Sequence, residues 1–165
     1  MGRDRLRRVR SAALRLLVPL LTQTVGRLPY GGLRRCAKAL AWLLLKTNRR
    51  YRERSAKHLA LAFPEASAGE LQELQRGCFL NASLNALETM QLLARGRQAF
   101  DRRLLIEGWE NVEREKGNRL LLLTCHSGFW ELLGVATARQ GLALFAVGRR
   151  PDEAVIGDLV RRVRA

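Results

Sequence analysis

The residue types best suited to catalysis in this chain are a histidine and a glutamate five positions apart, His126 and Glu131. They follow the apolar run Leu120–Leu123, and Gly128 lies between them. A continuous apolar run is typical of a buried strand, and a glycine after it favours a strand-to-helix turn. Such a turn would let Glu131 accept a hydrogen bond from one imidazole nitrogen while the other takes a proton from a hydroxyl. The spacing therefore predicts general-base chemistry.

Other interpretations of this segment stay open on the residues alone. His126 could be a buried core histidine, with Glu131 a favourable charge at a helix start. Cys125 could be an acyl-enzyme nucleophile beside His126, although neighbouring residues on a strand point to opposite faces. A small buried hydrophobic residue is the commoner role for such a cysteine. Phe129 and Trp130 are more often packing residues than ligand contacts, but Trp130 could line an acyl pocket.

The elements that must position this segment begin with a helical part. Four helices are predicted, over residues 3–26, 33–46, 48–62 and 67–94. The fourth opens on the capping box Ser67–Glu70, after Pro64 has ended the third. Its apolar face is predicted to hold Leu71, Leu74, Cys78, Phe79 and Ala82.

From residue 104 onward, short apolar runs alternate with helical patterns. Strands are predicted at Leu104–Glu107, Leu120–Cys125 and Leu142–Val147, and helices at 109–116, 128–139 and 152–164. Strand–helix order implies parallel pairing through right-handed crossovers. We therefore expect an α/β fold. Residues 1–65 would form a basic helical module, and residues 66–165 a helix plus the start of a mainly parallel sheet flanked by helices.

Positive charge is concentrated on the N-terminal side. The net charge is +15, and residues 1–57 alone hold sixteen basic and two acidic residues, a net of +14. Apolar residues interleave with these cations, as in amphipathic helices at an anionic membrane surface, with Trp42 at head-group depth. A core-facing helix pair with a solvated basic face is the alternative. A single tilted span over 12–30 is disfavoured, because Arg15 and Pro19 interrupt it.

Other classes of partner and site are less favoured by the composition. Nucleic acid is not the expected partner, because the basic region has few aromatic residues and no recognised nucleic-acid-binding module. The three cysteines are widely spaced and lack a CxxC pair, so neither a disulfide framework nor a zinc site is predicted.

The segment His126–Leu132 resembles the H-x4-D/E block of glycerolipid-type acyltransferases, and above all that of the bacterial lipid A late acyltransferase family. The same resemblance extends to Asn48–Arg50, His58–Glu65, Ile106–Glu110 and Val147–Pro151. Three positions depart from the family pattern. His58, Phe129 and Ala154 each stand where the family usually has asparagine.

The resemblance implies acyl transfer from an acyl carrier protein thioester to a hydroxyl of a lipid A precursor, an anionic glycolipid. His126 would be the general base, and Glu131 would hold its tautomer. An arginine would bind phosphate or stabilise the oxyanion. The residues expected to contact substrate are Arg149, Arg150, Trp130 and Gly128. No metal or organic cofactor is implied, because the thioester is already activated.

The resemblance also implies a location at the cytoplasmic face of the inner membrane. It implies a longer fold, of which these residues would be the N-terminal half. Two alternatives remain beside this function. The acceptor could be another lipid such as a lysophospholipid, or the chain could be a catalytically inactive fragment that binds membranes through its basic helices.

Overall fold

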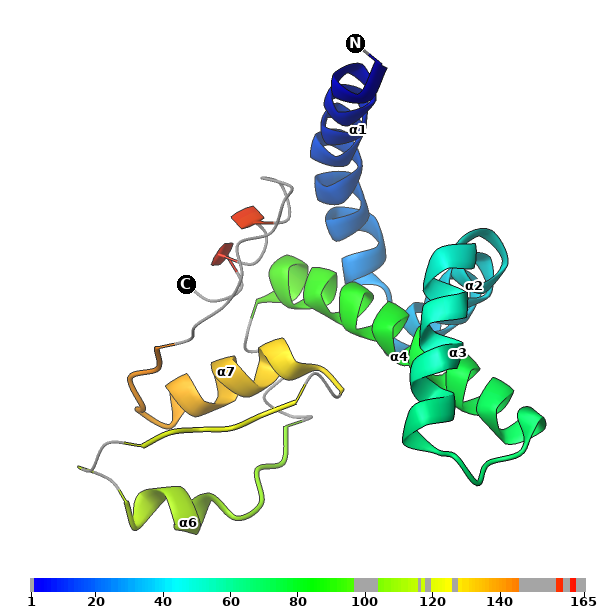
Figure 1. The fold of residues 1–165 in the computed structure, drawn as a ribbon. Helices are drawn as coiled ribbons and strands as arrows, with labels where there is room; N and C mark the ends of the chain where they lie inside the picture. The colour runs from blue at the N-terminus through cyan, green and yellow to red at the C-terminus, as the bar shows by residue number, and fades with distance from the viewer. Residues whose placement is uncertain are drawn as a thin grey trace.

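Helices dominate the part of the chain that the computed structural model describes (Figure 1). The described residues are 2–96, 104–115, 117, 120–125, 128–145, 157–158 and 161–162, with side chains in the first helix described at Val9 and from Ser11 onward. The elements are α1 (Gly2–Thr24), the 3-10 helix η1 (Val25–Arg27), α2 (Tyr30–Thr47), α3 (Arg49–Ala62), α4 (Ala68–Arg95), α6 (Trp109–Glu113) and α7 (Trp130–Arg139). The four helices predicted before residue 95 are therefore confirmed, with ends shifted by a few residues.

The capping box predicted at the start of α4 is confirmed. The Glu70 amide donates to the Ser67 hydroxyl at 3.3 Å, and the Glu70 carboxylate accepts from the Ser67 amide at 2.8 Å. The same carboxylate accepts from the Ser67 hydroxyl at 2.7 Å. These bonds satisfy amides that have no partner inside the helix, which fixes where α4 begins.

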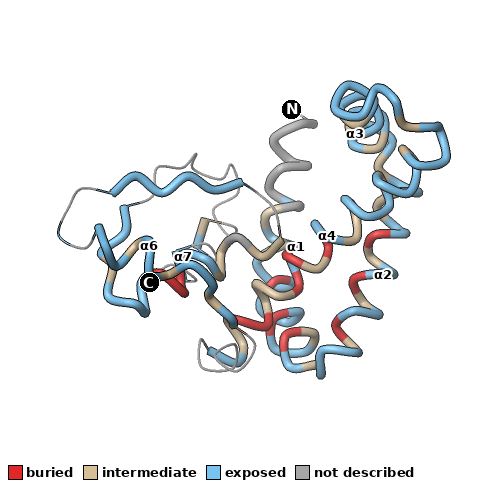
Figure 2. The backbone as a smooth tube through the Cα atoms, turned by 90° about the horizontal axis from the view of Figure 1, so that it is seen from below, coloured by how far each residue is buried: buried red, intermediate tan, exposed pale blue. Residues whose placement is uncertain are grey.

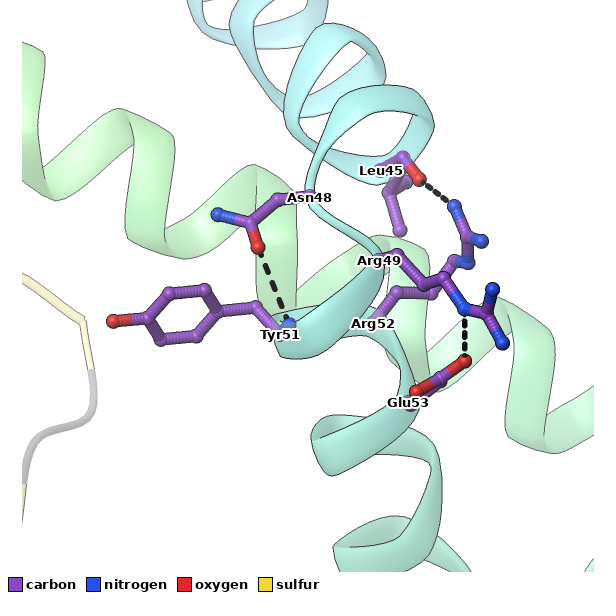
Figure 3. A network of polar contacts seen from close by, with 6 residues as sticks. All are labelled: Leu45, Asn48, Arg49, Tyr51, Arg52 and Glu53. Atoms are coloured by element: carbon purple, nitrogen blue, oxygen red, sulfur yellow. Dashed lines mark hydrogen bonds and ion pairs between the residues drawn. The ribbon is translucent and has the colours of Figure 1, made fainter.

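Side-chain hydrogen bonds define the corner between α2 and α3 (Figure 3). Asn48 caps α3 by accepting from the Tyr51 amide at 3.3 Å. Arg52 donates to the carbonyl oxygen of Leu45 at 2.6 Å, so it bonds back to the last turns of α2. The Gln75 amide group then donates to the Arg52 carbonyl oxygen at 2.7 Å and ties α3 to α4. Polar contacts matter here because no residue of α3 is buried.

The main core lies between α2 and α4. Leu33 and Ala37 of α2 are fully enclosed against Leu87 of α4. The partly buried residues around them are Val25, Cys36, Leu40, Leu80, Leu84 and Met90. Figure 2 shows most of the buried residues where α1, α2 and α4 meet, with a second group on α7. Burial of apolar area against α4 therefore holds the helical unit together.

The inward face of α4 differs from the predicted one. Leu74, Cys78 and Ala82 were expected to face the core, but all three are exposed. The buried positions are instead Ser83, Asn85, Leu87, Gln91 and Leu92. A pattern based on apolar residues misplaced this face because three of the five buried side chains are polar.

Gly26 in η1 lies against the backbone of α4. A Cβ added at Gly26 would lie 2.6 Å from the Met90 carbonyl oxygen and 2.8 Å from the Ala94 Cβ. Both distances are shorter than atoms tolerate, and a backbone carbonyl cannot rotate away. Glycine is therefore required by the close approach of the two segments.

Two polar side chains of α4 fasten the turn that follows Gly26. Buried Gln91 donates to the carbonyl oxygen of Leu28 at 3.0 Å. Arg95 donates to the same oxygen at 2.9 Å, to that of Gly26 at 3.3 Å, and to that of Arg27. These carbonyl groups end a helix and have no helical partner, so the two side chains complete the turn between α1 and α2.

The predicted α/β fold with a mainly parallel sheet is wrong for the described residues, which contain no strand. The three predicted strands are irregular at residues 104–107, 120–125 and 142–145, while Ala146 and Val147 lie outside the described residues. Leu121 is 86% exposed, Leu123 is 89% exposed and Phe145 is 97% exposed. An apolar run becomes a strand only when a neighbouring backbone pairs with it, and within the described ranges these runs do not pair.

The helices predicted in the second part are confirmed where they are described. The predicted helix 109–116 is observed as α6 and the predicted helix 128–139 as α7, both shorter than expected. Most of the predicted helix 152–164 lies outside the described residues, with helical backbone at 157–158 and 161–162. The domain boundary between residues 65 and 66 stays a prediction.

We expect alanine at two glycines to have opposite effects on stability. Gly26→Ala should lower the free energy of unfolding by about 1–3 kcal/mol, because its methyl group meets Met90 and Ala94. Gly77→Ala should raise it by about 0.5–1 kcal/mol, because Gly77 lies inside α4 with open space around it. Urea denaturation followed by far-UV circular dichroism measures both. An unchanged or stabilised Gly26→Ala would contradict the close approach.

The capping box predicts a pH dependence of defined sign. Hydrogen bonds from the Ser67 hydroxyl and amide lower the pKa of Glu70 below its ordinary value of 4.5. The stabilisation is therefore present above the ordinary pKa and is lost as pH falls through the lowered folded-state pKa. Glu70→Gln should remove this dependence, and Glu73→Gln, on the same helix, should retain it. Urea denaturation measured from neutral pH to below pH 4.5 tests the prediction. It fails if the free energy of unfolding depends on pH in the same way for Glu70→Gln and the parent.

Candidate active site

The carboxylate of the predicted pair lies at the start of α7. Glu131 is in the first turn of this ten-residue helix and is half-buried. A carboxylate at this position is favoured by the positive end of the helix dipole. Formation of α7 thus fixes the backbone of Glu131 where the sequence predicted it.

The turn that precedes α7 depends on Gly128. Its φ is +59°, in the left-handed region that glycine adopts without strain. Phe129 follows at the N-cap position, and its side chain makes no capping hydrogen bond. Gly128 and Phe129 thus lead directly into the helix that carries Glu131. His126, the proposed base, lies outside the described residues, so its pairing with Glu131 stays a prediction.

α7 is seated on the C-terminal half of α4 by a small apolar cluster. Leu92 of α4 and Val135 of α7 are buried against each other, with Leu93, Phe129 and Leu132 packed around them. The packing role predicted for Phe129 is confirmed. Its phenyl ring contributes hydrophobic contact between α4 and α7.

The part of α4 that positions α7 differs from the apolar face predicted for that helix. Leu92 and Leu93 are adjacent leucines near the end of a predicted helix, and they were not assigned to its apolar face. Their pairing with Val135 joins segments more than forty positions apart in the sequence. An adjacent leucine pair at a helix end was the signal for a second contact surface, but it did not identify the partner.

The C-terminal end of α7 is closed by glycine. Gly141 has a φ of +83°, and its amide donates to the Ala138 carbonyl oxygen at 3.1 Å. The Leu142 amide donates to the Thr137 carbonyl oxygen at 3.4 Å. This pair of bonds is the Schellman motif, which satisfies carbonyl groups at a helix end. The predicted stop near Gly141 is confirmed.

The remaining predicted site residues are only partly described. The backbone of Trp130 begins α7, whereas Arg149 and Arg150 lie outside the described residues. Cys125 is exposed and is not part of a strand. The predicted placement of Cys125 and His126 on opposite faces of a strand is therefore not supported by the described residues.

Metal ligands can be assessed only within the described ranges. There, no group of three or more His, Cys, Asp or Glu side chains is placed to hold a metal ion. Cys36, Cys78 and Cys125 are all free thiols. The described geometry thus comprises an acidic residue at a helix start, a glycine turn before it and an apolar contact beneath it.

Comparison with known proteins assigns the chain to a family. The family described as bacterial lipid A biosynthesis acyltransferase matches residues 1–165, the whole of the sequence. No curated protein and no solved structure gives a significant match. Because the match extends from the first helix through the His126–Glu131 block, it covers both the helical unit and the candidate site. The chain belongs to the bacterial lipid A biosynthesis acyltransferase family.

Proposed function

We propose that this chain transfers a fatty acyl group from an acyl carrier protein thioester to a hydroxyl of a lipid A precursor. The observation that carries the proposal is the family match over residues 1–165, which includes an H-x4-E block at His126 and Glu131. Family membership supplies the reaction class, acyl transfer in lipid A biosynthesis. The carrier-protein donor and the precursor hydroxyl are the specific parts of the proposal.

His126 acts as the general base in the proposed reaction. Its imidazole removes the proton from the acceptor hydroxyl while that oxygen forms a bond to the thioester carbonyl carbon. Collapse of the tetrahedral intermediate breaks the carbon–sulfur bond, and the departing thiolate takes the proton from the imidazolium. Glu131 accepts a hydrogen bond from the second imidazole nitrogen and keeps the ring in the reactive tautomer. The position of Glu131 at the start of α7 supports this role.

Negative charge on the thioester oxygen needs hydrogen-bond donors. The positive end of the α7 dipole lies beside this segment, and Gly128 leads into the helix with no side chain of its own. Arg149 or Arg150 supplies a guanidinium for the same oxyanion or for a phosphate of the acceptor. Gly128 and Trp130 line the substrate site in this proposal.

The exposed side of α1 supports a location at a membrane surface. Val18 and Thr22 are buried, whereas the opposite and flanking sides of the helix present large apolar residues to solvent. These exposed residues are Val9, Leu16, Leu17, Leu20 and Leu21. Figure 1 shows α1 projecting from the other helices, which leaves this side open. An apolar stripe within a segment of net charge +14 fits the boundary between acyl chains and anionic head groups.

None of the helices in the described part of the chain combines the length and the apolar character that a bilayer span requires. We propose that the chain associates with the cytoplasmic face of the inner membrane, where both the carrier protein and the lipid precursor can reach it.

We expect His126→Ala to lower kcat for acyl transfer by about 10²- to 10⁴-fold, because the general base is removed. The matched control is His58→Ala, since His58 is the other histidine of the chain and is exposed on α3. The assay follows radiolabelled acyl transfer from acyl carrier protein to a lipid A precursor in mixed micelles. Equal loss in both variants, or turnover retained by His126→Ala, would remove His126 from the mechanism.

We expect Glu131→Gln to lower kcat by up to about 10⁴-fold with little change in KM, because glutamine holds the imidazole tautomer poorly. Glu113→Gln, an exposed glutamate on α6, serves as the control and should keep the parent rate. The same assay applies, with circular dichroism to confirm that α7 still forms. A parent-like kcat for Glu131→Gln would separate Glu131 from catalysis.

A catalytically silent membrane-binding role is the second candidate, and the exposed stripe of α1 is the observation that favours it. Vesicle binding by the parent chain without acyl transfer to either a lipid A precursor or a lysophospholipid would support that role. If the chain acylates a lysophospholipid and not a lipid A precursor, the proposed acceptor is wrong, while the proposed acyl-transfer reaction stands.

A further inference from the structure

The apolar face of α2 is already covered by the protein itself. Leu33, Ala37 and Ala41 are buried, and Leu33 and Ala37 pack against Leu87 of α4. An interfacial helix inserts its apolar face into lipid. Since that face of α2 is occupied, an external partner would meet the other side of the helix, where exposed Leu43 adjoins the charged residues.

The outward side of α2 carries a line of cations around one tryptophan. We define the cationic ridge as Arg35, Lys38, Trp42 and Lys46. Residues three or four apart lie on one side of a helix, so these four share the side opposite the buried residues. All four are exposed, and Trp42 is 62% exposed. A tryptophan that protrudes from a water-facing helix is poorly solvated unless a partner covers it.

Acidic residues do little to neutralise the surroundings of the cationic ridge. In residues 30–62, Glu53 is the one acidic residue, and nine residues are basic. Glu53 is engaged by Arg49 at 2.6 Å on the same helix (Figure 3). The outward residues of α3 add further exposed cations, namely Arg50, Arg54 and Lys57. A positively charged surface attracts an anionic partner over a distance that the salt concentration sets.

We propose that the cationic ridge is the docking surface for an acidic, water-soluble protein, the acyl carrier protein that delivers the donor thioester. This identification of the partner rests on the proposed function. Cations guide an acidic partner into an encounter and set its register, while tryptophan and arginine are the side chains that most often supply binding energy in protein interfaces. Trp42 is the central anchor, and Arg35, Lys38 and Lys46 surround it.

An anionic bilayer is the competing partner, and the distribution of apolar side chains argues against it for this surface. Five large apolar residues are exposed on α1, whereas α2 exposes only Trp42 and Leu43 beyond its N-terminal Tyr30, beside the three charges of the cationic ridge. The two surfaces therefore differ in chemistry. α1 fits acyl chains, and α2 fits a charged partner that stays in water.

The experiment compares two triple charge reversals that change the net charge equally. The ridge variant is Arg35→Glu, Lys38→Glu, Lys46→Glu. The control variant is Arg76→Glu, Arg114→Glu, Arg162→Glu, three exposed arginines outside the ridge. Binding of each full chain to unacylated holo acyl carrier protein is measured by isothermal titration calorimetry at low and high salt. Circular dichroism confirms that both variants fold.

The expected result is at least about tenfold weaker binding by the ridge variant, with a reduced salt dependence, and little change in the control variant. Trp42→Ala, which leaves every charge in place, should also weaken binding about tenfold or more. Equal weakening in both triple variants would mean that net charge alone matters, and it would overturn the proposal. Failure of the parent chain to bind the carrier protein at low salt would overturn it as well.

Sedimentation with phosphatidylglycerol vesicles tests the competing partner. The ridge variant should bind vesicles about as well as the control variant. If it loses vesicle binding and keeps carrier-protein binding, the cationic ridge faces lipid and the proposal is wrong. Because these measurements need no turnover, they are independent of the proposed reaction. A parent chain that binds carrier protein through the ridge but transfers no acyl group would retain the docking surface and refute the proposed function.

Discussion

Besides its main core with α2, the C-terminal half of α4 contacts two other segments, and both the turn between α1 and α2 and the candidate site depend on these contacts. On one side, Gly26 lies against Met90 and Ala94, while Gln91 and Arg95 hydrogen-bond the carbonyl groups that follow. On the other side, Leu92 packs against Val135 of α7. One helical stretch therefore closes the turn between α1 and α2 and also seats the helix of the candidate site. Loss of α4 packing would disturb both at once.

This arrangement assigns different chemistry to different helices. α7 presents Glu131 in its first turn. It follows Gly128, whose positive φ is a conformation that favours glycine. α1 exposes apolar side chains, and the outward side of α2 exposes cations around Trp42. The family match over the whole chain and these surfaces therefore support the same proposed reaction.

The sequence predicted elements that are specified by local signals. Ser67 and Glu70 mark a helix start, and Gly141 marks a helix end, because capping bonds form between residues close in the chain. Contacts between distant residues were not predictable in this way. The inward face of α4 includes polar Ser83, Asn85 and Gln91, which an apolar pattern does not select. Leu120–Cys125 has the composition of a strand, but no composition specifies the backbone that would pair with it. At the candidate site, the turn at Gly128 and the place of Glu131 at a helix start were predictable from the sequence. The packing of Leu92 against Val135, which holds α7 on α4, was not.

The most direct test of the role of α4 is a double-mutant cycle on Leu92 and Val135. Leu92→Ala, Val135→Ala and the double variant are unfolded with urea, and the coupling between the two side chains is calculated. Direct packing predicts a coupling of about 0.5–3 kcal/mol. Leu33→Ala paired with Val135→Ala is the control and should be additive within about 0.5 kcal/mol, because Leu33 belongs to the other cluster. Additive effects of Leu92 and Val135 would contradict the claim that α4 seats the helix carrying Glu131.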